Sequence, residues 1–419
     1  MMDLRELRRL TPGLNSGALA TALAVALLFV LTVVTDEPAQ AQSFQVLYSF
    51  SGGLDGGQPY SGMTISSGGD LFGTTHTGNQ GTNWGQVYEL QRSGSGYTFT
   101  DLALFDGSLE APAVFGPGRA IYSTSPNNLT LYQHGYVLRV SPPASNICYS
   151  KACLWQATVL YAFSGGADGS IPNYGALIFD PTGNIYGTTS AGGSSNGVVY
   201  EVMGSGSNWT EQVLHSFSGS PDGASPASGV IFDNLGNLYG TTTAGGASGN
   251  GAVYELSPSG GGWTERVIYS FTGGGDGSYP AGGLIFDQAG NLYGTTNAGG
   301  TGGGGTVFKL SPSGGGWGYS LLYSFSGGAN CGPWGSLTLN GGSLYGTTVC
   351  DGTNSAGNVF ELTPSGNSWT YRSLHDFTAG GTDGELPYCS VAFDPAGNIY
   401  GTTLRGGANL QGVVWRITP

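Results

Sequence analysis

Positively charged residues are scarce in this sequence. Lys and Arg together number 12 among 419 residues, against 26 Asp and Glu, and charged residues of both signs make up only 9%. A nucleic-acid-binding protein needs a basic track to neutralise phosphates, so we expect no nucleic-acid partner. The chain also lacks a phosphate-binding P-loop and the nucleophile elbow of α/β enzymes.

The sequence contains a single long apolar run. Residues 17–34 carry no charge, they follow a basic segment with Arg5, Arg8 and Arg9, and small residues stand at Ala39 and Ala41. This pattern predicts a signal peptide over residues 1–41 and a secreted, periplasmic or cell-surface location in a bacterium. The alternative is an uncleaved anchor, since 18 apolar residues just span a bilayer. Without residues 1–41, nine basic and 22 acidic residues remain, a net charge of −13.

Cysteines are few, and none has metal-ligand spacing, so we expect no metal and no cofactor. In an oxidising compartment disulfides are permitted. Cys148 and Cys153 lie in one loop and are predicted to pair. Cys331 and Cys350 fall in the same repeat and are predicted to form a second disulfide, with Cys389 as an alternative partner of Cys350.

Glycine, by contrast, is abundant, with 78 residues, and it occurs within an internal repeat of about 54 residues. The tripeptide GTT follows an aromatic residue six times, and a divergent copy, YST, begins at Tyr122. A second landmark is the Phe that ends runs similar to LYSF. The GTT glycines are Gly73, Gly187, Gly240, Gly294, Gly346 and Gly401, and the Phe residues are Phe50, Phe105, Phe163, Phe217, Phe271, Phe325 and Phe377.

Each repeat divides into four strand-like segments separated by Gly, Asn and Asp turns. In residues 229–271 these are GVIFD, NLYGTT, GAVYEL and WTERVIYSF. Four short strands per repeat is typical of a β-propeller blade. We therefore predict an all-β, seven-bladed β-propeller of four-stranded antiparallel blades over residues 42–419, a monomer, with the first strand of each blade lining the central channel. The recurrent aromatic before GTT is interpreted as inter-blade core, and the Gly after it as allowing close approach of the neighbouring blade.

The two ends of the chain are complementary. FQVLYSF, at residues 44–50, resembles a fourth strand without its first three, and the C-terminal repeat has three strands without a fourth. Pairing residues 44–50 with residues 412–417 would complete the seventh blade and leave no open sheet edge. We therefore predict that the N-terminal strand closes the ring.

The repeat pattern, GNLYGTT followed by GG, G-x-VFEL, G-x-W and LYSF, resembles that of the choice-of-anchor tandem repeat GloVer-containing proteins. The resemblance covers nearly the whole chain beyond residue 41. It implies an exported bacterial protein with propeller-type repeats, and it implies no particular activity. Many such proteins carry a C-terminal anchor, whereas this sequence ends at Pro419 without one, so we expect no attachment by that route.

The loops between blades carry the candidate chemistry. Asp-Gly recurs there at Asp55, Asp168, Asp222, Asp276 and Asp383. These carboxylates could form a cation-binding ring, but we interpret them as loop caps, because each blade supplies only one. His215 and His375 replace Tyr in the LYSF-like runs and are interpreted as structural.

Blades 1 and 2 depart most from the consensus and hold the candidate binding site. The residues are His76, Trp84, Asp106, Glu110 and His134. Imidazole and carboxylate groups bind or transfer protons, and an indole stacks on sugars. Three functions remain open. The leading one is a non-catalytic binding protein that presents loops to a glycan, peptide or protein. The others are a polysaccharide lyase or glycosidase acting at blades 1 and 2, and a structural envelope protein.

Overall fold

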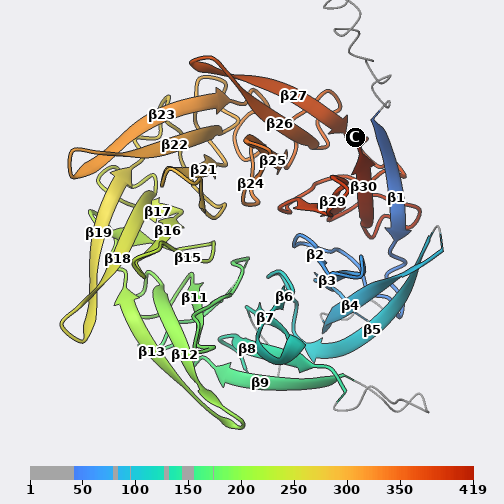
Figure 1. The fold of residues 1–419 in the computed structure, drawn as a ribbon, viewed down its shortest axis with the longest axis horizontal. Helices are drawn as coiled ribbons and strands as arrows, with labels where there is room; N and C mark the ends of the chain where they lie inside the picture. The colour runs from blue at the N-terminus through green and yellow to red at the C-terminus, as the bar shows by residue number, and fades with distance from the viewer. Residues whose placement is uncertain (1–41, 79–83, 95, 127–131, 144–154, 173) are drawn as a thin grey trace, which may run out of the picture. The chain divides into compact units, whose positions relative to one another are not determined.

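Each sequence repeat forms one four-stranded antiparallel sheet, and seven such sheets form a ring (Figure 1). The structure is a computed structural model that describes residues 42–78, 84–94, 96–126, 132–143, 155–172 and 174–419. The ring is built from the unit Ser43–Thr418. The prediction of an all-β, seven-bladed propeller is confirmed.

The blades are numbered along the chain, and their strands are given from the innermost to the outermost. Blade 1 has β2 (Thr64–Ile65), β3 (Leu71–Thr75), β4 (Trp84–Ser93) and β5 (Gly96–Asp106). Blade 2 has β6 (Val114–Phe115), β7 (Ile121–Ser125), β8 (Tyr136–Ser141) and β9 (Gln156–Ala162). Blade 3 has β10 (Ile178–Phe179), β11 (Ile185–Thr189), β12 (Val198–Ser205) and β13 (Asn208–Ser216). Blade 4 has β15 (Ile231–Phe232), β16 (Leu238–Thr242), β18 (Ala252–Ser259) and β19 (Gly262–Ser270).

The remaining blades follow the same plan. Blade 5 has β20 (Ile285–Phe286), β21 (Leu292–Thr296), β22 (Thr306–Ser313) and β23 (Gly316–Ser324). Blade 6 has β24 (Thr338–Asn340), β25 (Ser343–Thr348), β26 (Asn358–Ser365) and β27 (Ser368–Asp376). Blade 7 has β28 (Ala392–Phe393), β29 (Ile399–Thr403), β30 (Val413–Thr418) and β1 (Ser43–Ser49). A small pair, β14 (Gly223–Ala224) and β17 (Ala244–Gly245), joins two loops.

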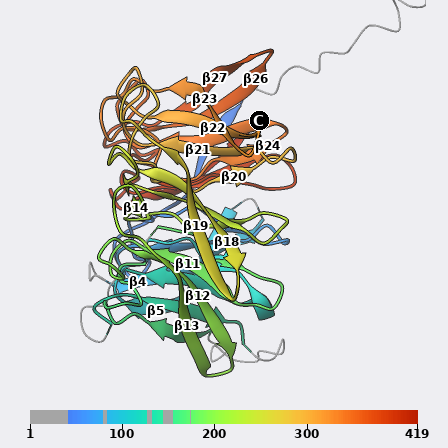
Figure 2. The same ribbon diagram turned by 90° about the vertical axis from the view of Figure 1, so that its left-hand side faces the viewer.

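The inner strands are shorter than the sequence predicted. The expected strand of residues 229–233 is reduced to the two residues of β15. Asp233 ends it because its side chain accepts the backbone N–H groups of Leu235 and Asn237 at 2.8 and 2.9 Å, which forms a turn. The outer two strands are longer and form hairpins, of which β18 and β19 lie in front in Figure 2.

The GTT motif performs two structural tasks. Its Gly lies opposite the third-strand aromatic of its own blade, as Gly187 does opposite Tyr200, and an added β-carbon would collide with that ring. The neighbour that requires Gly is therefore within the blade, and the expectation of a contact with the adjacent blade was wrong. The first Thr joins blades, because the hydroxyl of Thr188 donates to the carbonyl of Ser228 at 2.7 Å and that of Thr402 to Ser61 at 2.7 Å.

The core lies between blades, as predicted for the aromatic before GTT. Tyr186 packs edge-on against Phe232 of the next blade with centroids 5.0 Å apart, and Tyr239 packs in the same way against Phe286 at 5.2 Å. The Phe of the LYSF-like run makes a second such contact, as Phe217 does with Tyr254 at 5.0 Å. Each blade therefore buries much of its apolar area against its neighbours, and stability depends on an unbroken ring.

The N-terminal strand closes that ring. β1 pairs antiparallel with β30, with Ser43 opposite Thr418 and Ser49 opposite Val413. Phe50, which follows β1, is completely buried and packs on Tyr88 of blade 1 with centroids 5.3 Å apart. The predicted closure is confirmed.

Candidate functional site

The inter-blade loops, which run from the fourth strand of one blade to the first strand of the next, are held by their Asp-Gly pairs. Asp168 accepts hydrogen bonds from the Ser164 backbone N–H at 2.7 Å, the Ser164 hydroxyl at 2.5 Å and the Tyr161 hydroxyl at 2.9 Å. Asp55 and Asp276 accept the equivalent bonds. These carboxylates act as loop caps, in agreement with the sequence interpretation.

Five aromatic rings, each from a different inter-blade loop, converge at the centre of the ring of blades. We call them the aromatic cluster: Tyr60, Tyr174, Tyr279, Trp334 and Tyr388. The Tyr60 centroid lies 4.9 Å from that of Tyr174 and 4.6 Å from that of Tyr388. Trp334 lies 5.6 Å from both Tyr174 and Tyr388, and 5.7 Å from Tyr279. Blades that are far apart in sequence thus contribute to one aromatic surface.

The hollow bordered by Tyr60, Tyr174, Trp334 and Tyr388 is small, with a volume of about 60 Å³. Its other lining residues are mainly Gly and Ser, and the Gly residues allow neighbouring loops to touch. An added β-carbon at Gly62 would come within 2.6 Å of the Ser390 carbonyl oxygen. A hollow of this size holds a few water molecules and cannot enclose a sugar ring. A larger ligand must therefore lie on the outer side of the aromatic rings.

One carboxylate lies among these rings, that of the predicted site residue Glu110. Its Oε1 lies 3.1 Å from Nδ1 of His76, close enough for an ion pair with a protonated imidazole but not aligned for a hydrogen bond. The Tyr174 phenol lies close to both Glu110 and Tyr60. Burial first, and then the charge of Glu110, raise the pKa of the Tyr174 phenol. The phenol therefore keeps its proton and serves as a hydrogen-bond donor at neutral pH.

The other predicted site residues lie in blades 1 and 2 without joining this network through the contacts described here. Trp84 is 44% exposed and lies opposite Asp106 in the β4–β5 ladder. The main-chain oxygen of Asp106 accepts the Tyr136 hydroxyl at 3.3 Å. The exposed ring of His134 lies against Gly165 in the loop after β9. The structure thus pairs His76 with Glu110 and Trp84 with Asp106, and ligand binding by any of the five stays a prediction.

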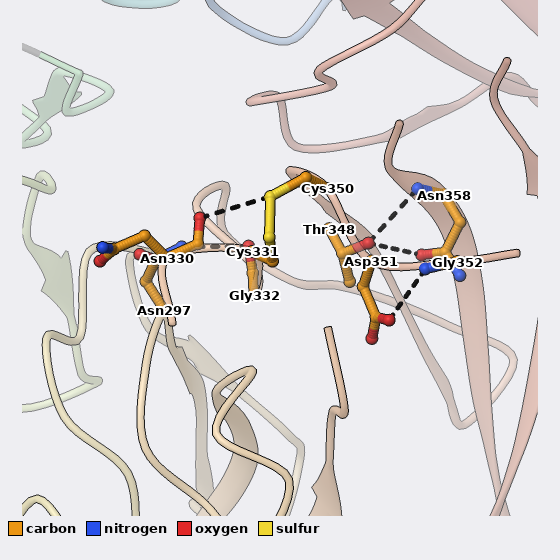
Figure 3. The surroundings of a disulfide bond; sticks show 9 residues. All are labelled: Asn297, Asn330, Cys331, Gly332, Thr348, Cys350, Asp351, Gly352 and Asn358. Atoms are coloured by element: carbon orange, nitrogen blue, oxygen red, sulfur yellow. Dashed lines mark hydrogen bonds between the residues drawn. A yellow bond between two sulfur atoms is a disulfide. The ribbon is translucent and has the colours of Figure 1, made fainter. Parts of the chain in front are cut away.

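The Cys331–Cys350 disulfide fixes one of the loops that carry the cluster (Figure 3). The two Cα atoms lie 4.4 Å apart, and the Cys350 N–H also donates to the Cys331 carbonyl at 3.2 Å. Trp334 follows Cys331 by three residues, so the disulfide restrains the loop that presents this indole. This predicted disulfide is confirmed, whereas Cys148 and Cys153 lie outside the described residues. Cys389 is a buried free thiol, and burial raises its pKa.

A groove of about 970 Å³ between blades 1 and 2 is the largest hollow among those described here. Phe72, Phe115 and Trp155 line it together with Asp70, Glu89 and Arg119. In blade 3 the equivalent acid, Glu201, accepts hydrogen bonds from Asn184 and Tyr186, both at 2.8 Å. Blade 1 has Asp70 and Phe72 at these two positions, so Glu89 has no such donors. Burial, and then the charge of Asp70, raise the pKa of Glu89.

Sequence reasoning missed the aromatic cluster and Glu89, although both leave a signal. Three cluster residues directly follow a Pro, in QPY, GPW and LPY. These tripeptides stand at the same point of three inter-blade loops, where the repeats of blades 4 and 5 have Ala after the Pro. Glu89 is marked by the replacement of Asn-x-Tyr with Asp-x-Phe before GTT.

Among the residues that the structure describes, no helix is long and apolar enough to cross a membrane. A search of curated proteins finds no match. Solved structures with a similar chain path include a putative oxidoreductase, described as a glucose dehydrogenase, from Thermus thermophilus. It is 14% identical, with 90% of this chain and all of that chain covered, and a TM-score of 0.44. A putative 6-phosphogluconolactonase from Bacteroides uniformis is also 14% identical, with coverage of 75% and 84% and a TM-score of 0.48.

A third similar structure is a mutant of AofleA from Arthrobotrys oligospora, which is 12% identical, with coverage of 80% and 91% and a TM-score of 0.41. None of these similarities is close enough to carry a functional argument. Family-level similarity is specific, because the model of the Gloeobacter/Verrucomicrobia repeat matches residues 114–332 and 316–419. With this match over most of its length, and with seven repeats folded as seven blades, the chain belongs to the Gloeobacter/Verrucomicrobia repeat family.

Proposed function

We propose that this protein is an exported, non-catalytic binding protein that holds a glycan against the outer side of the aromatic cluster. The observation that carries the proposal is the convergence of Tyr60, Tyr174, Trp334 and Tyr388 from four separate inter-blade loops. Aromatic rings with polar tips stack on the apolar faces of sugars while their hydroxyl groups form hydrogen bonds. Glu110 and His76 add a polar pair beside the rings.

The charge of the site favours a neutral or cationic ligand. Glu110 is largely buried, with 13% of its side chain exposed, and the whole chain has a net charge of −14. An anionic polysaccharide would be repelled by both. The Cys331–Cys350 disulfide fits an oxidising compartment, where extracellular glycans occur.

A glycan-array screen of the purified protein, followed by calorimetric titration of the strongest ligand, tests this function. Loss of a central aromatic contact commonly costs about 2 kcal/mol or more, which is more than tenfold in Kd. Trp334→Ala and Tyr388→Ala should therefore weaken binding by at least about tenfold. Trp209→Ala, which alters an indole on the outer strand of blade 3, is the matched control and should bind normally. Equal affinity of all three variants would contradict the proposal.

A second candidate function is glycoside hydrolysis in the groove between blades 1 and 2. The observation that favours it is Glu89, a half-buried carboxylate with a raised pKa beside Asp70 in an aromatic groove. A carboxylic acid with a raised pKa beside a second carboxylate is the pair that glycosidases use. Release of reducing sugar from an array-positive glycan, and its loss in Glu89→Gln, would support the enzyme. Turnover that Glu89→Gln leaves unchanged would exclude this groove as its site.

A further inference from the structure

The outermost strands of neighbouring blades meet through a recurring side-chain pair. Its first member is the residue two before the landmark Phe, and its second lies on the fourth strand of the next blade. In three junctions the pair is a stack of two phenol or phenyl rings. These are Tyr48 with Phe99, Tyr269 with Tyr319 and Tyr323 with Tyr371, with centroids 5.3, 4.7 and 4.5 Å apart.

The junction between blades 3 and 4 departs from this pattern in both members. His215 on β13 replaces the first ring, and Glu265 on β19 replaces the second. Nε2 of His215 lies 3.3 Å from Oδ2 of Asp222. One ligand atom from each of His215, Asp222 and Glu265 lies within 4.8 Å of the other two. A stacked aromatic contact has thus been exchanged for three potential metal ligands at one place.

A second feature of the same place is a set of buried polar atoms without partners. The hydroxyl of Tyr254 is completely buried, and neither it nor Oε1 of Glu265 has a hydrogen-bond partner among the described residues. Buried polar groups are normally satisfied, so the unpaired Tyr254 hydroxyl and Glu265 oxygen can interact with a ligand at this place. The equivalent atoms of Tyr200 and Glu211 are also unpaired at the junction of blades 2 and 3, where Tyr161 stands in place of histidine, so the histidine is what distinguishes the junction of blades 3 and 4.

We propose that His215, Asp222 and Glu265 bind a divalent transition-metal ion of the zinc class at the junction of blades 3 and 4. One imidazole nitrogen and two carboxylates are ligands that Zn²⁺ accepts, whereas Ca²⁺ and Mg²⁺ prefer oxygen ligands alone. Zinc bonds of about 2.0–2.1 Å place tetrahedral ligands roughly 3.3 Å apart. His215 and Asp222 already have this spacing, whereas the three ligand atoms lie within 4.8 Å of one another, so Glu265 must move closer to bind the same ion. Water takes the fourth position, because His215 and Asp222 are 21% and 14% exposed. The buried Tyr254 hydroxyl would then act as a hydrogen-bond donor that supports the ligand carboxylates.

Sequence reasoning could not find this site because the ligands do not follow one another with metal-binding spacing. His215 and Asp222 are seven residues apart, and Glu265 comes from the next blade. The chain also contains a natural control. His375 pairs with Asp383 at 3.0 Å, as His215 does with Asp222, but its ring stacks on Phe44 and no Glu replaces that partner.

Calorimetric titration of the tag-free, chelator-treated protein with ZnCl₂ at neutral pH tests the proposal. We expect a single tight site, and Zn²⁺ should raise the melting temperature. His215→Tyr restores the residue found in four other repeats, so it should fold and yet lose the site. Glu265→Gln should lose it as well, and Tyr254→Phe should weaken binding by about 10–100-fold, as loss of a supporting group does. His375→Tyr should bind like the wild type.

Two results would overturn the metal site. One is the absence of saturable Zn²⁺ binding by the wild-type protein. The other is equal binding by wild type and His215→Tyr, which would place the ion elsewhere. Cobalt provides a spectroscopic check, because Co²⁺ bound by one nitrogen and oxygen ligands in a four-coordinate site should give visible absorption bands. Those bands should be missing in His215→Tyr and retained in His375→Tyr.

Discussion

Replacing Glu211 with Gln should stabilise the protein at neutral and alkaline pH and leave it unchanged in acid. Glu211 lies on β13 at the position where four other blades carry an aromatic ring, and its Oε1 is buried without a partner among the described residues. Burial first, and the charge of Asp168 second, raise the pKa of Glu211 from 4.5 to about 7. In the folded protein the carboxyl group therefore holds its proton over a range where the unfolded chain has lost it.

The sign and size of the effect follow from this pKa. Below pH 4.5 both states are protonated, and the neutral acid is tolerated like an amide. As pH rises from 4.5 to 7, the unfolded chain loses this proton while the folded state still holds it, so the free energy of unfolding falls. The full rise in pKa corresponds to roughly 3 kcal/mol. Solvent screening at this partly exposed strand reduces the expected gain of Glu211→Gln to about 1–2 kcal/mol at pH 8.

Glu361 provides a matched control of opposite sign. Burial acts to raise its pKa, but hydrogen bonds from Tyr345 and Arg372 outweigh burial and lower it. Its Oε2 lies 2.7 Å from Arg372. This stabilisation is present above the unfolded pKa and is lost as the pH falls, so Glu361→Gln should destabilise the protein at pH 8, by up to about 1 kcal/mol.

Thermal and urea unfolding of both variants, followed by circular dichroism from pH 4 to pH 9, would measure these differences. The stabilisation by Glu211→Gln should grow between pH 4.5 and 7 and then stay constant. A gain of the same size at pH 4.5 and pH 8, or no gain at either, would refute the reasoning.

Three further predictions test the architecture. Deleting residues 43–50 should lower the free energy of unfolding by more than the roughly 3–5 kcal/mol expected for Phe50→Ala alone, because β30 loses its partner strand. An unchanged melting temperature would disprove closure. Gly401→Ala should cost about 1–3 kcal/mol through collision with Trp415, whereas Gly260→Ala, in an open hairpin turn with nothing near its β-carbon, should show only the smaller cost of a positive φ. Replacing Cys331 and Cys350 by Ser should cost about 3 kcal/mol for a loop of this length, and non-reducing peptide mapping should find the bond in the wild type.

The sequence was sufficient for the scaffold because each structural task is repeated. Tyr186, Tyr239 and Tyr293 occupy equivalent positions, and only a ring of similar blades gives all of them the same neighbours. Closure by the N-terminal strand was predictable for the same reason, because FQVLYSF matches the fourth strand of the other repeats. The lengths of the inner strands were less well predicted, because a residue such as Asp233 can either end a strand or begin the following turn.

The site was harder to predict because it depends on where loops meet. Tyr60, Tyr174 and Trp334 belong to blades 1, 3 and 6, and their contacts are set by how the loops turn towards the channel. His76 and Glu110 were selected for their chemistry, and the structure places them 3.1 Å apart. His215 was interpreted as a structural substitute for Tyr, and in the structure its Nε2 lies 3.3 Å from Oδ2 of Asp222. The approach of Glu265 from the next blade could not be read from spacing.

The most direct test of the proposed function is a crystal structure of the protein with the strongest glycan ligand from the array. The account predicts a sugar ring stacked on the outer side of Trp334 and Tyr388, within hydrogen-bonding reach of the Tyr60 or Tyr174 hydroxyl. A ligand bound in the groove of Phe72, Phe115 and Trp155, with the aromatic cluster empty, would contradict it.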